Sequence, residues 1–317
     1  MLAFNTSYYY DRVSLKVVSK KIIIEKLPNF LQDKSIMIVI TDSSDNIVLQ
    51  SLLELPETPE VSWKNIPDGD YFLNIYHNIA DKENRYWPYL QNRSVALRIY
   101  RGRMQFVESP IASENRRVLS ELLCDYRSLK TYIEPTYLYQ CNAIEIKTLA
   151  DKITKFKVTP MQKLLAIHDW VAENIYYDRD ALNSLECRSK DYSALEVLLN
   201  NKCVCRGFAN LGVALMRASN IPSIGIPCYA LNISAKGGWE KKENHSHSPN
   251  HIIAAAYVSN RWILMDITWD SDNIFENGKF TNITEIGCSR KYFDTTVEMI
   301  SNTHKLMTPF YGEYIFI

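Results

Sequence analysis

The chain has 317 residues, 46% hydrophobic and 23% charged, a composition typical of a globular protein long enough for two domains. Lys and Arg together number 36, as do Asp and Glu, so the net charge is zero, which argues against a broad basic surface for nucleic acid or anionic membrane. No stretch approaches the roughly 18 consecutive apolar residues that a membrane helix needs.

The cysteine content indicates a reducing compartment. The seven cysteines are an odd number and, apart from Cys203 and Cys205, lie far apart, so they do not form a disulfide framework. The first residues lack a basic segment followed by an apolar run. We therefore expect a cytoplasmic protein, or a secreted one if a leader precedes this numbering.

The first hundred residues predict an antiparallel β-sandwich of the immunoglobulin-like kind over residues 1–110. Short runs rich in Val, Ile and Tyr are separated by polar turns at residues 42–45 and 67–70. This region has no cluster of titratable residues, which favours a packing or binding module. The predicted strands are Val13–Val18, Ser35–Thr41, Asn46–Leu53, Tyr71–His77, Val95–Arg101 and Met104–Val107.

Residues 111–145 are predicted to form a helical linker, with helices over Asn115–Tyr126 and Asn142–Lys155. The second domain, residues 146–317, then opens on a helix. Thr159 is placed to cap it, a proline stands at the first helical position, and Gln162 can close a capping box. Apolar residues recur after it at helical spacing, so we expect this helix to lay one face on a core.

Two more helices and a hairpin are predicted further along the second domain. A second capping box, from Ser193 to Glu196, begins one helix, and another follows Cys205 and ends at Asn220 and Pro222. Two apolar runs, His251–Val258 and Arg261–Ile267, flank Ser259-Asn260, which is suited to a two-residue hairpin loop.

Cys205 is the candidate nucleophile. Thiol chemistry requires a thiolate, and a helix N-terminus, a nearby imidazolium and partial exposure all favour that form. Cys205 opens a predicted helix, where unpaired N–H groups and the helix dipole attract negative charge. The same N–H groups are candidate donors to an oxyanion.

The hairpin register supplies a base and a partner for it. If Ser259-Asn260 is the loop, counting outward pairs His251 with Thr268 and places Asp266 diagonally from His251 on the same face. Diagonal neighbours in an antiparallel pair are about 7–8 Å apart, within reach of a carboxylate and an imidazole. We therefore predict that Asp266 orients His251.

The residues around these positions resemble the transglutaminase-like superfamily. The run VCRGFANL, residues 204–211, is similar to its nucleophile motif; HIIAAAYV and RWILMDITWD, residues 251–258 and 261–270, are similar to its His and Asp strands. IHDWV and NIYYD, residues 167–171 and 174–178, resemble the helix before the nucleophile. The sequence departs from the family pattern at Cys203, Asn220 and Ile253.

This resemblance implies an α+β protein with a papain-like core and a catalytic triad of Cys205, His251 and Asp266, with no cofactor or metal. It implies acyl transfer through a thioester on Cys205, to water in a protease or amidase and to an amine in a transglutaminase. We predict hydrolysis of a peptide or isopeptide bond, with a protein or peptide as substrate presented by the first domain. Trp170 and Tyr177 are both candidates for a side-chain oxyanion donor.

Two other interpretations remain open. Cys203 and Cys205, with histidines at 245, 247 and 251, offer enough ligands for tetrahedral zinc, although the spacing is tight and Asp266 would have no role. Alternatively, the chain is a non-catalytic scaffold, against which the presence of all three triad residues counts. The glycines fit no phosphate-binding loop.

Overall fold

The structure is a computed structural model, and it describes most of the chain. The described residues are 7–10, 13–26, 35–44, 46–54, 59–78, 86–88, 95–107, 110–122, 128–184, 186–231, 239, 249–282, 288–295 and 297–308. They form two compact units, each described by itself below. One unit takes the described residues of Met1–Ser113, Leu231–Asn244 and Thr296–Thr303, and the other takes those of Glu114–Ala230, His245–Thr295 and His304–Ile317. The division at residues 110 and 145 stays a prediction.

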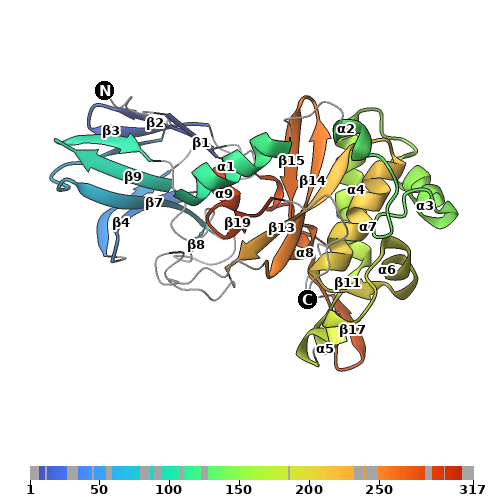
Figure 1. Cartoon of the computed structure of the whole chain (residues 1–317). Helices are drawn as coiled ribbons and strands as arrows, with labels where there is room; N and C mark the ends of the chain where they lie inside the picture. The colour runs from blue at the N-terminus through green and yellow to red at the C-terminus, as the bar shows by residue number, and fades with distance from the viewer. Residues whose placement is uncertain are drawn as a thin grey trace. The chain divides into compact units, whose positions relative to one another are not determined.

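The first unit contains two antiparallel sheets (Figure 1). The sheet with strand order β1-β2-β3-β6 comprises β1 (Ser7–Tyr10), β2 (Val13–Val18), β3 (Lys21–Lys26) and β6 (Glu60–Ser62). The other has the order β10-β9-β7-β4-β5, with β8 (Tyr86–Pro88) paired to β7. Its remaining strands are β4 (Ile36–Asp42), β5 (Ile47–Leu53), β7 (Gly69–Asn78), β9 (Val95–Tyr100) and β10 (Arg103–Phe106).

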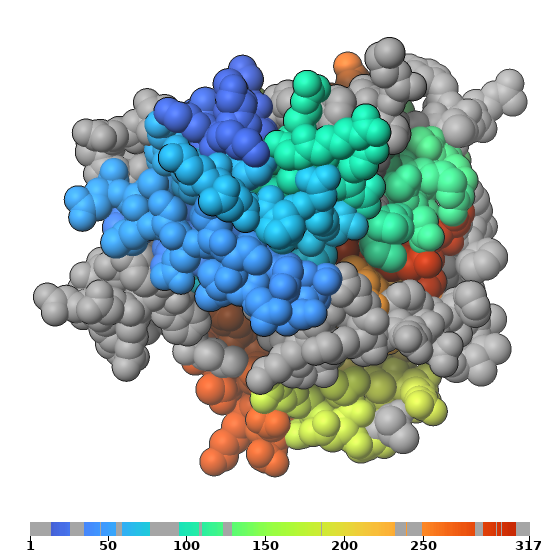
Figure 2. Space-filling view, turned by 90° about the vertical axis from the view of Figure 1, so that its left-hand side faces the viewer, coloured from blue at the N-terminus to red at the C-terminus, as the bar shows by residue number. Residues whose placement is uncertain are grey.

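Alternation of buried and exposed residues explains why these segments are strands. In β9 every second side chain is buried, and β4 carries four buried side chains. All six predicted strands are present, whereas β1, β3, β6 and β8 were not predicted. In Figure 2 the segments of this unit form the blue to blue-green surface that faces the viewer. The immunoglobulin-like assignment stays a prediction, since antiparallel order alone does not establish that topology.

The helices predicted for the linker are confirmed with shifted ends. α1 runs over Pro110–Leu122 and α3 over Ile144–Thr154, with the short α2 (Ser128–Thr131) between them. The predicted end of the first helix, residues 123–126, lies outside the described residues. α3 packs against helices of the second unit through its buried Ile146 and Ala150.

A five-stranded antiparallel sheet, in the order β18-β15-β14-β13-β19, forms the centre of the second unit. α7 contacts β13 and β14, and also contacts α3, α4 and α6, so it lies between the sheet and the other helices (Figure 1). Its residues from Gly207 to Arg217 are all buried. The strands are β13 (Ser223–Ala230), β14 (His251–Val258), β15 (Arg261–Met265), β18 (Phe293–Thr295) and β19 (His304–Leu306).

The remaining elements are short, apart from α4 (Pro160–Asn174), α6 (Ala194–Asn200) and α7 (Cys205–Ala218). A small sheet has the order β12-β11-β16-β17. Its strands are β12 (Lys202–Cys203), β11 (Tyr176–Asp178), β16 (Asn273–Glu276) and β17 (Lys279–Asn282). The other helices are α5 (Arg179–Asn183), η2 (Glu186–Arg188), α8 (Ile267–Asp270) and α9 (Val297–Ile300), the last in the first unit. None of the helices in the described part of the chain could span a membrane.

Capping boxes were predicted at the N-termini of two helices, α4 and α6. The capping box of Thr159 and Gln162 is confirmed, but Ser193 makes no side-chain cap, so the second predicted box is wrong. Ser193 instead bonds Asp191, and Gln140, distant in sequence, accepts the hydrogen bond of the Leu195 N–H at 2.8 Å. A residue distant in sequence therefore accepts a hydrogen bond at the start of α6, where Ser193 was expected to provide the cap.

Asn220 follows the end of α7 in the left-handed backbone conformation, with φ of 61°. The N–H of Ile221 then donates back to the carbonyl of Met216 at 2.9 Å, which closes the helix end. Asparagine tolerates this conformation better than other residues that carry a Cβ. Asn220, one of the positions that depart from the family pattern, therefore keeps the turn.

Candidate active site

Cys205 is the first residue of α7 and follows β12 almost directly. Its side chain is half-buried. Val204 occupies the N-cap position, and its apolar side chain cannot cap the helix. The N–H groups of the first turn therefore face this end of the helix without a side-chain acceptor at the N-cap, and together with the helix dipole they favour a negative charge on Cys205.

Cys203 has a different environment, although only one residue separates it from Cys205. It is fully buried, and burial, followed by the nearby charges at Cys205 and Asp178, raises the pKa of its thiol well above the usual range. Gly207 allows this close packing, because a Cβ there would come within 2.5 Å of the Cys203 sulfur. Cys203 is therefore a neutral core residue, and the zinc site that would use it is not supported by the structure.

The hairpin that carries the histidine is confirmed. Ser259 and Asn260 both have positive φ, as a two-residue turn requires, and Val258 pairs with Arg261. His251 is the first residue of β14 and is buried. The register holds as far as the pair of Ala254 with Met265, where β15 ends.

The predicted course of the chain after β15 is wrong. Residues 266–267 do not extend the strand, and Thr268 lies in α8 rather than opposite His251. Asp266 is the N-cap of α8, and its Oδ1 accepts a hydrogen bond from the Trp269 N–H at 3.1 Å. The helix turn leaves Oδ2 of the same carboxylate directed at His251, whose Nε2 lies 2.8 Å away.

The electrostatics of His251 follow from its two neighbours. Burial alone lowers the pKa of its imidazole, but the Asp266 carboxylate and the hydrogen-bonded Cys205 side chain together raise it to about 10. Burial raises the pKa of Asp266, yet the contacts with His251 and His304 prevail and hold it well below its usual range. The imidazole therefore stays protonated between an ionised carboxylate and the sulfur at the start of α7.

Comparison with known proteins shows which family this region resembles. Residues 147–267 match the sequence model of the transglutaminase-like superfamily. That segment of the chain is similar to the transglutaminase-like superfamily. It contains α4 and α7 and the whole hairpin that carries His251 and Asp266. The rest of the chain lies outside the match.

Two curated relatives match part of the chain. Kyphoscoliosis peptidase of Mus musculus is 25% identical over 111 residues and that of Homo sapiens is 26% identical over 113 residues. These matches cover 35% and 36% of this chain but only 16% of each relative. The chain therefore spans a small part of the length of the curated relatives it matches.

Two solved structures are similar to the chain at low identity. A candidate cysteine protease from Cytophaga hutchinsonii is 21% identical, with a TM-score of 0.36, and the match covers 62% of this chain and 57% of that one. A candidate protease from Parabacteroides distasonis is 13% identical, with a TM-score of 0.28, over 66% of this chain and 37% of that one.

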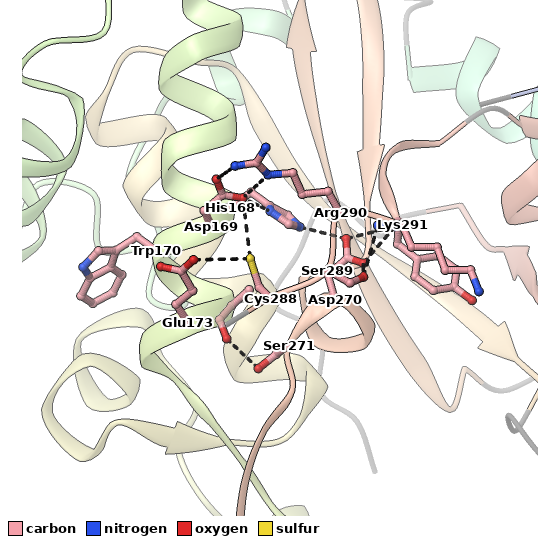
Figure 3. A network of polar contacts seen from close by, with 12 residues as sticks. His168, Asp169, Trp170, Glu173, Asp270, Ser271, Cys288, Ser289, Arg290 and Lys291 are labelled. Carbon is pink, nitrogen blue, oxygen red and sulfur yellow. Dashed lines mark hydrogen bonds and ion pairs between the residues drawn. The ribbon is translucent and has the colours of Figure 1, made fainter. Parts of the chain in front are cut away.

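A second group of Cys, His and Asp side chains lies elsewhere in the second unit (Figure 3). His168, on α4, is fully buried between two carboxylates, with Nδ1 3.1 Å from Asp169 and Nε2 3.0 Å from Asp270. Burial lowers the pKa of His168, but these carboxylates prevail and raise it. The Arg290 guanidinium completes the network through two contacts with Asp169, at 3.1 and 2.6 Å.

The thiol in this second group is not a nucleophile. Cys288 Sγ lies 3.8 Å from oxygens of both Asp169 and Glu173, and it donates toward them. Burial, followed by these negative charges, raises its pKa to about 12. Both nitrogens of His168 are already paired with carboxylates, so the imidazole is not available as a base for this thiol. The network is therefore an ion-paired structural element.

Two groups of described side chains have the ligand types and spacing of a metal site. They are His168, Asp169 and Cys288, and His251, Asp266 and His304. In the first, Arg290 already neutralises Asp169, and in the second both rings bond one carboxylate oxygen. Each group is thus satisfied by hydrogen bonds and ion pairs between its own members and neighbours. His245 and His247, named for the alternative zinc site, lie outside the described residues.

Sequence reasoning missed His304. It is fully buried on β19, and its Nε2 lies 3.1 Å from the same Asp266 oxygen that bonds His251. It lies 38 residues beyond Asp266 in the sequence, with no hairpin to link the two positions. Only the sheet order, which adds β19 beside β13, brings it to the site.

Proposed function

We propose that this protein is a thiol-dependent enzyme that hydrolyses peptide or isopeptide amide bonds through a thioester on Cys205. The observation that carries the proposal is the position of His251, bonded to Asp266 at 2.8 Å and near enough to the cysteine that opens α7 for that side chain to raise its pKa. This arrangement supports a triad in which each member has one role.

In the acylation step, the Cys205 sulfur attacks the carbonyl carbon of the scissile amide and a carbon–sulfur bond forms. The protonated His251 gives its proton to the amide nitrogen, the carbon–nitrogen bond breaks, and the amine leaves. The raised pKa of His251, about 10, keeps the proton available for this transfer at neutral pH. Asp266 stays ionised throughout and stabilises the imidazolium.

In the deacylation step, His251 is neutral and accepts a proton from water. The resulting hydroxide attacks the thioester carbon, the carbon–sulfur bond breaks, and a carboxylic acid is released. The sulfur leaves as a thiolate beside the newly protonated His251, so the enzyme returns to its starting state with atoms and charge balanced.

The oxyanion formed in each step requires hydrogen-bond donors. The backbone N–H groups in the first turn of α7 are the first candidates. Tyr177 is the side-chain candidate we favour over Trp170. Burial and then the charge at Cys205 raise the pKa of Tyr177 well above its usual value, so its hydroxyl remains a donor and lies within the electrostatic reach of that sulfur.

Water is the acceptor we propose, because the curated relatives are named peptidases. The alternative acceptor is a primary amine, as in protein-glutamine transamidation. A glutamine-containing protein substrate incubated with a fluorescent primary amine distinguishes the two. We expect new amino and carboxyl termini and no fluorescent protein; covalent incorporation of the amine with intact substrate would replace hydrolysis with transamidation.

The proposed pair of a Cys205 thiolate and a His251 imidazolium predicts the order in which the cysteines react. Near pH 6 we expect iodoacetamide to alkylate Cys205 about tenfold or more faster than Cys187, which is similarly half-buried. The advantage should disappear in His251→Ala, because the imidazolium that stabilises the thiolate is lost. Mass spectrometry of peptides from a timed series measures each rate.

The pH dependence of the alkylation rate gives a second test of the proposed thiolate–imidazolium pair. In the parent protein the Cys205 alkylation rate should change little from about pH 6 to pH 9, since the pKa of His251 lies near 10. Equal rates for Cys205 and Cys187 across this range would contradict the proposed thiolate–imidazolium pair and leave a non-catalytic scaffold as the better description.

A further inference from the structure

Asp266 accepts three hydrogen bonds in a site from which solvent is excluded. The Trp269 N–H bonds Oδ1, and both His251 Nε2 and His304 Nε2 bond Oδ2, at 2.8 and 3.1 Å. The residue has no exposed surface. A buried carboxylate needs hydrogen-bond donors for its lone pairs. Here two different histidines donate to a single oxygen, Oδ2.

The backbone of His304 is fixed independently of its ring. β19 pairs with β13, with His304 opposite Ala230. The side chain of Asn115, on α1, donates to the His304 carbonyl at 2.9 Å and accepts from the Leu306 N–H at 2.7 Å. Because these bonds hold the strand by its main chain, the imidazole bond to Asp266 is not required to keep β19 in the sheet.

The His304 ring packs against other aromatic rings of the site. Its centroid lies 4.5 Å from that of Trp269 and 6.0 Å from that of Tyr292, while the His251 ring is 5.5 Å away. These rings come from α8, from the segment before β18 and from β14. The charged group that the Nε2 of His304 contacts is the carboxylate of Asp266, at the N-cap of α8.

We propose that His304 is a positioning residue of the active site, which donates its Nε2 proton to Asp266 Oδ2 and so holds this carboxylate facing His251. This inference rests on the proposed function and deepens it. With His304 in place, Oδ2 has both lone-pair directions occupied and cannot rotate away when His251 gains or loses its proton. Without that donor, the carboxylate is held by the Trp269 N–H and His251 alone.

The test compares two replacements of the ring. His304→Phe keeps an aromatic ring against Trp269 but removes the donor, and His304→Gln keeps an N–H donor of similar reach. We expect His304→Phe to slow iodoacetamide alkylation of Cys205 near pH 6 by about tenfold, because His251 loses its fixed partner and the thiolate fraction falls. Near pH 9 its rate should approach that of the parent. His304→Gln should recover most of the rate.

The outcomes separate this inference from the proposed function. If the parent shows no rapid alkylation of Cys205 near pH 6, the proposed function fails and the role of His304 fails with it. If the parent reacts rapidly and folded His304→Phe matches it at every pH, or reacts faster, only the role of His304 is overturned. A purely structural role would change the unfolding temperature without this pH-dependent loss and without recovery in His304→Gln.

A measurement on the parent protein covers the case in which His304→Phe does not fold. In ¹⁵N-histidine-labelled protein, the nitrogen shifts of His304, assigned by their loss in His304→Gln, report which ring nitrogen carries a proton. The proposal requires a protonated Nε2 at neutral pH. An unprotonated Nε2 would overturn it, because that atom could not donate to Asp266.

Discussion

Replacing Cys205 with alanine is expected to abolish amide hydrolysis, with a fall in kcat on the order of 10⁴-fold or more. Without the sulfur, no thioester can form, and His251 has no thiolate to pair with. The fold should be retained, because the side chain is half-buried at a helix end and alanine is a strong helix former. Hydrolysis of the best substrate from a fluorogenic peptide-amide library measures the effect, and circular dichroism confirms the fold.

Cys288→Ala is the matched control for this experiment. Cys288 also lies beside a histidine and acidic residues, but its neighbours hold its thiol protonated, with a pKa of about 12. Its loss should therefore leave kcat within about twofold of the parent value, within the range of structural side effects of a single replacement. Equal activity of Cys205→Ala and the parent would remove the enzyme assignment, and loss of activity in Cys288→Ala alone would move the nucleophile to the other group.

Asp270→Ala should be among the most destabilising single replacements in the second unit, lowering the free energy of unfolding by about 3–5 kcal/mol. The carboxylate is completely buried and accepts hydrogen bonds from His168 at 3.0 Å, the Ser289 hydroxyl at 2.6 Å and the Tyr292 N–H at 3.0 Å. Its removal leaves a protonated imidazole and two other donors without their acceptor. Urea unfolding of the variant and the parent measures the difference.

Asp294→Asn provides the comparison with an ion pair near the surface. Asp294 bonds Arg261 through both oxygens, at 2.6 and 2.7 Å, but both side chains are substantially exposed. We expect a loss of no more than about 1 kcal/mol. Similar losses in the two variants would contradict the structural importance assigned to the buried network.

The effect of Asp270→Ala should also depend on pH. Burial lowers the pKa of His168, but the carboxylates of Asp169 and Asp270 outweigh this effect and raise that pKa above its ordinary value of about 6.5. A group with a raised folded pKa stabilises the protein fully below its unfolded pKa, and that contribution is lost as pH rises through the folded pKa. The difference in the free energy of unfolding between Asp270→Ala and the parent should therefore become smaller in alkaline solution.

Local sequence was sufficient where one short segment determines the structure. The capping box at Thr159, the turn at Ser259-Asn260 and the start of α7 at Cys205 all follow from a few consecutive residues. The turn also indicated that Asp266 lies near His251, although the carboxylate makes the contact from the N-cap of α8 and not across the paired strands.

The remaining features depend on contacts between distant segments. Gln140 caps α6 from another loop, and His304 reaches Asp266 only because β19 joins the sheet beside β13. The change from strand to helix at Asp266 also escaped prediction, since an apolar run predicts an extended strand whereas the carboxylate caps a helix. No pattern in the segments themselves indicates these partners.

The strand order of the central sheet affects how the protein should be shortened for study. The segment that matches the superfamily, residues 147–267, contains β13, β14 and β15 but ends before β18 and β19, which border them. A polypeptide limited to that segment would expose the backbone hydrogen-bonding groups of β13 and β15 as two open sheet edges, a common cause of self-association. The segment of family similarity is therefore narrower than the sheet that contains its hairpin.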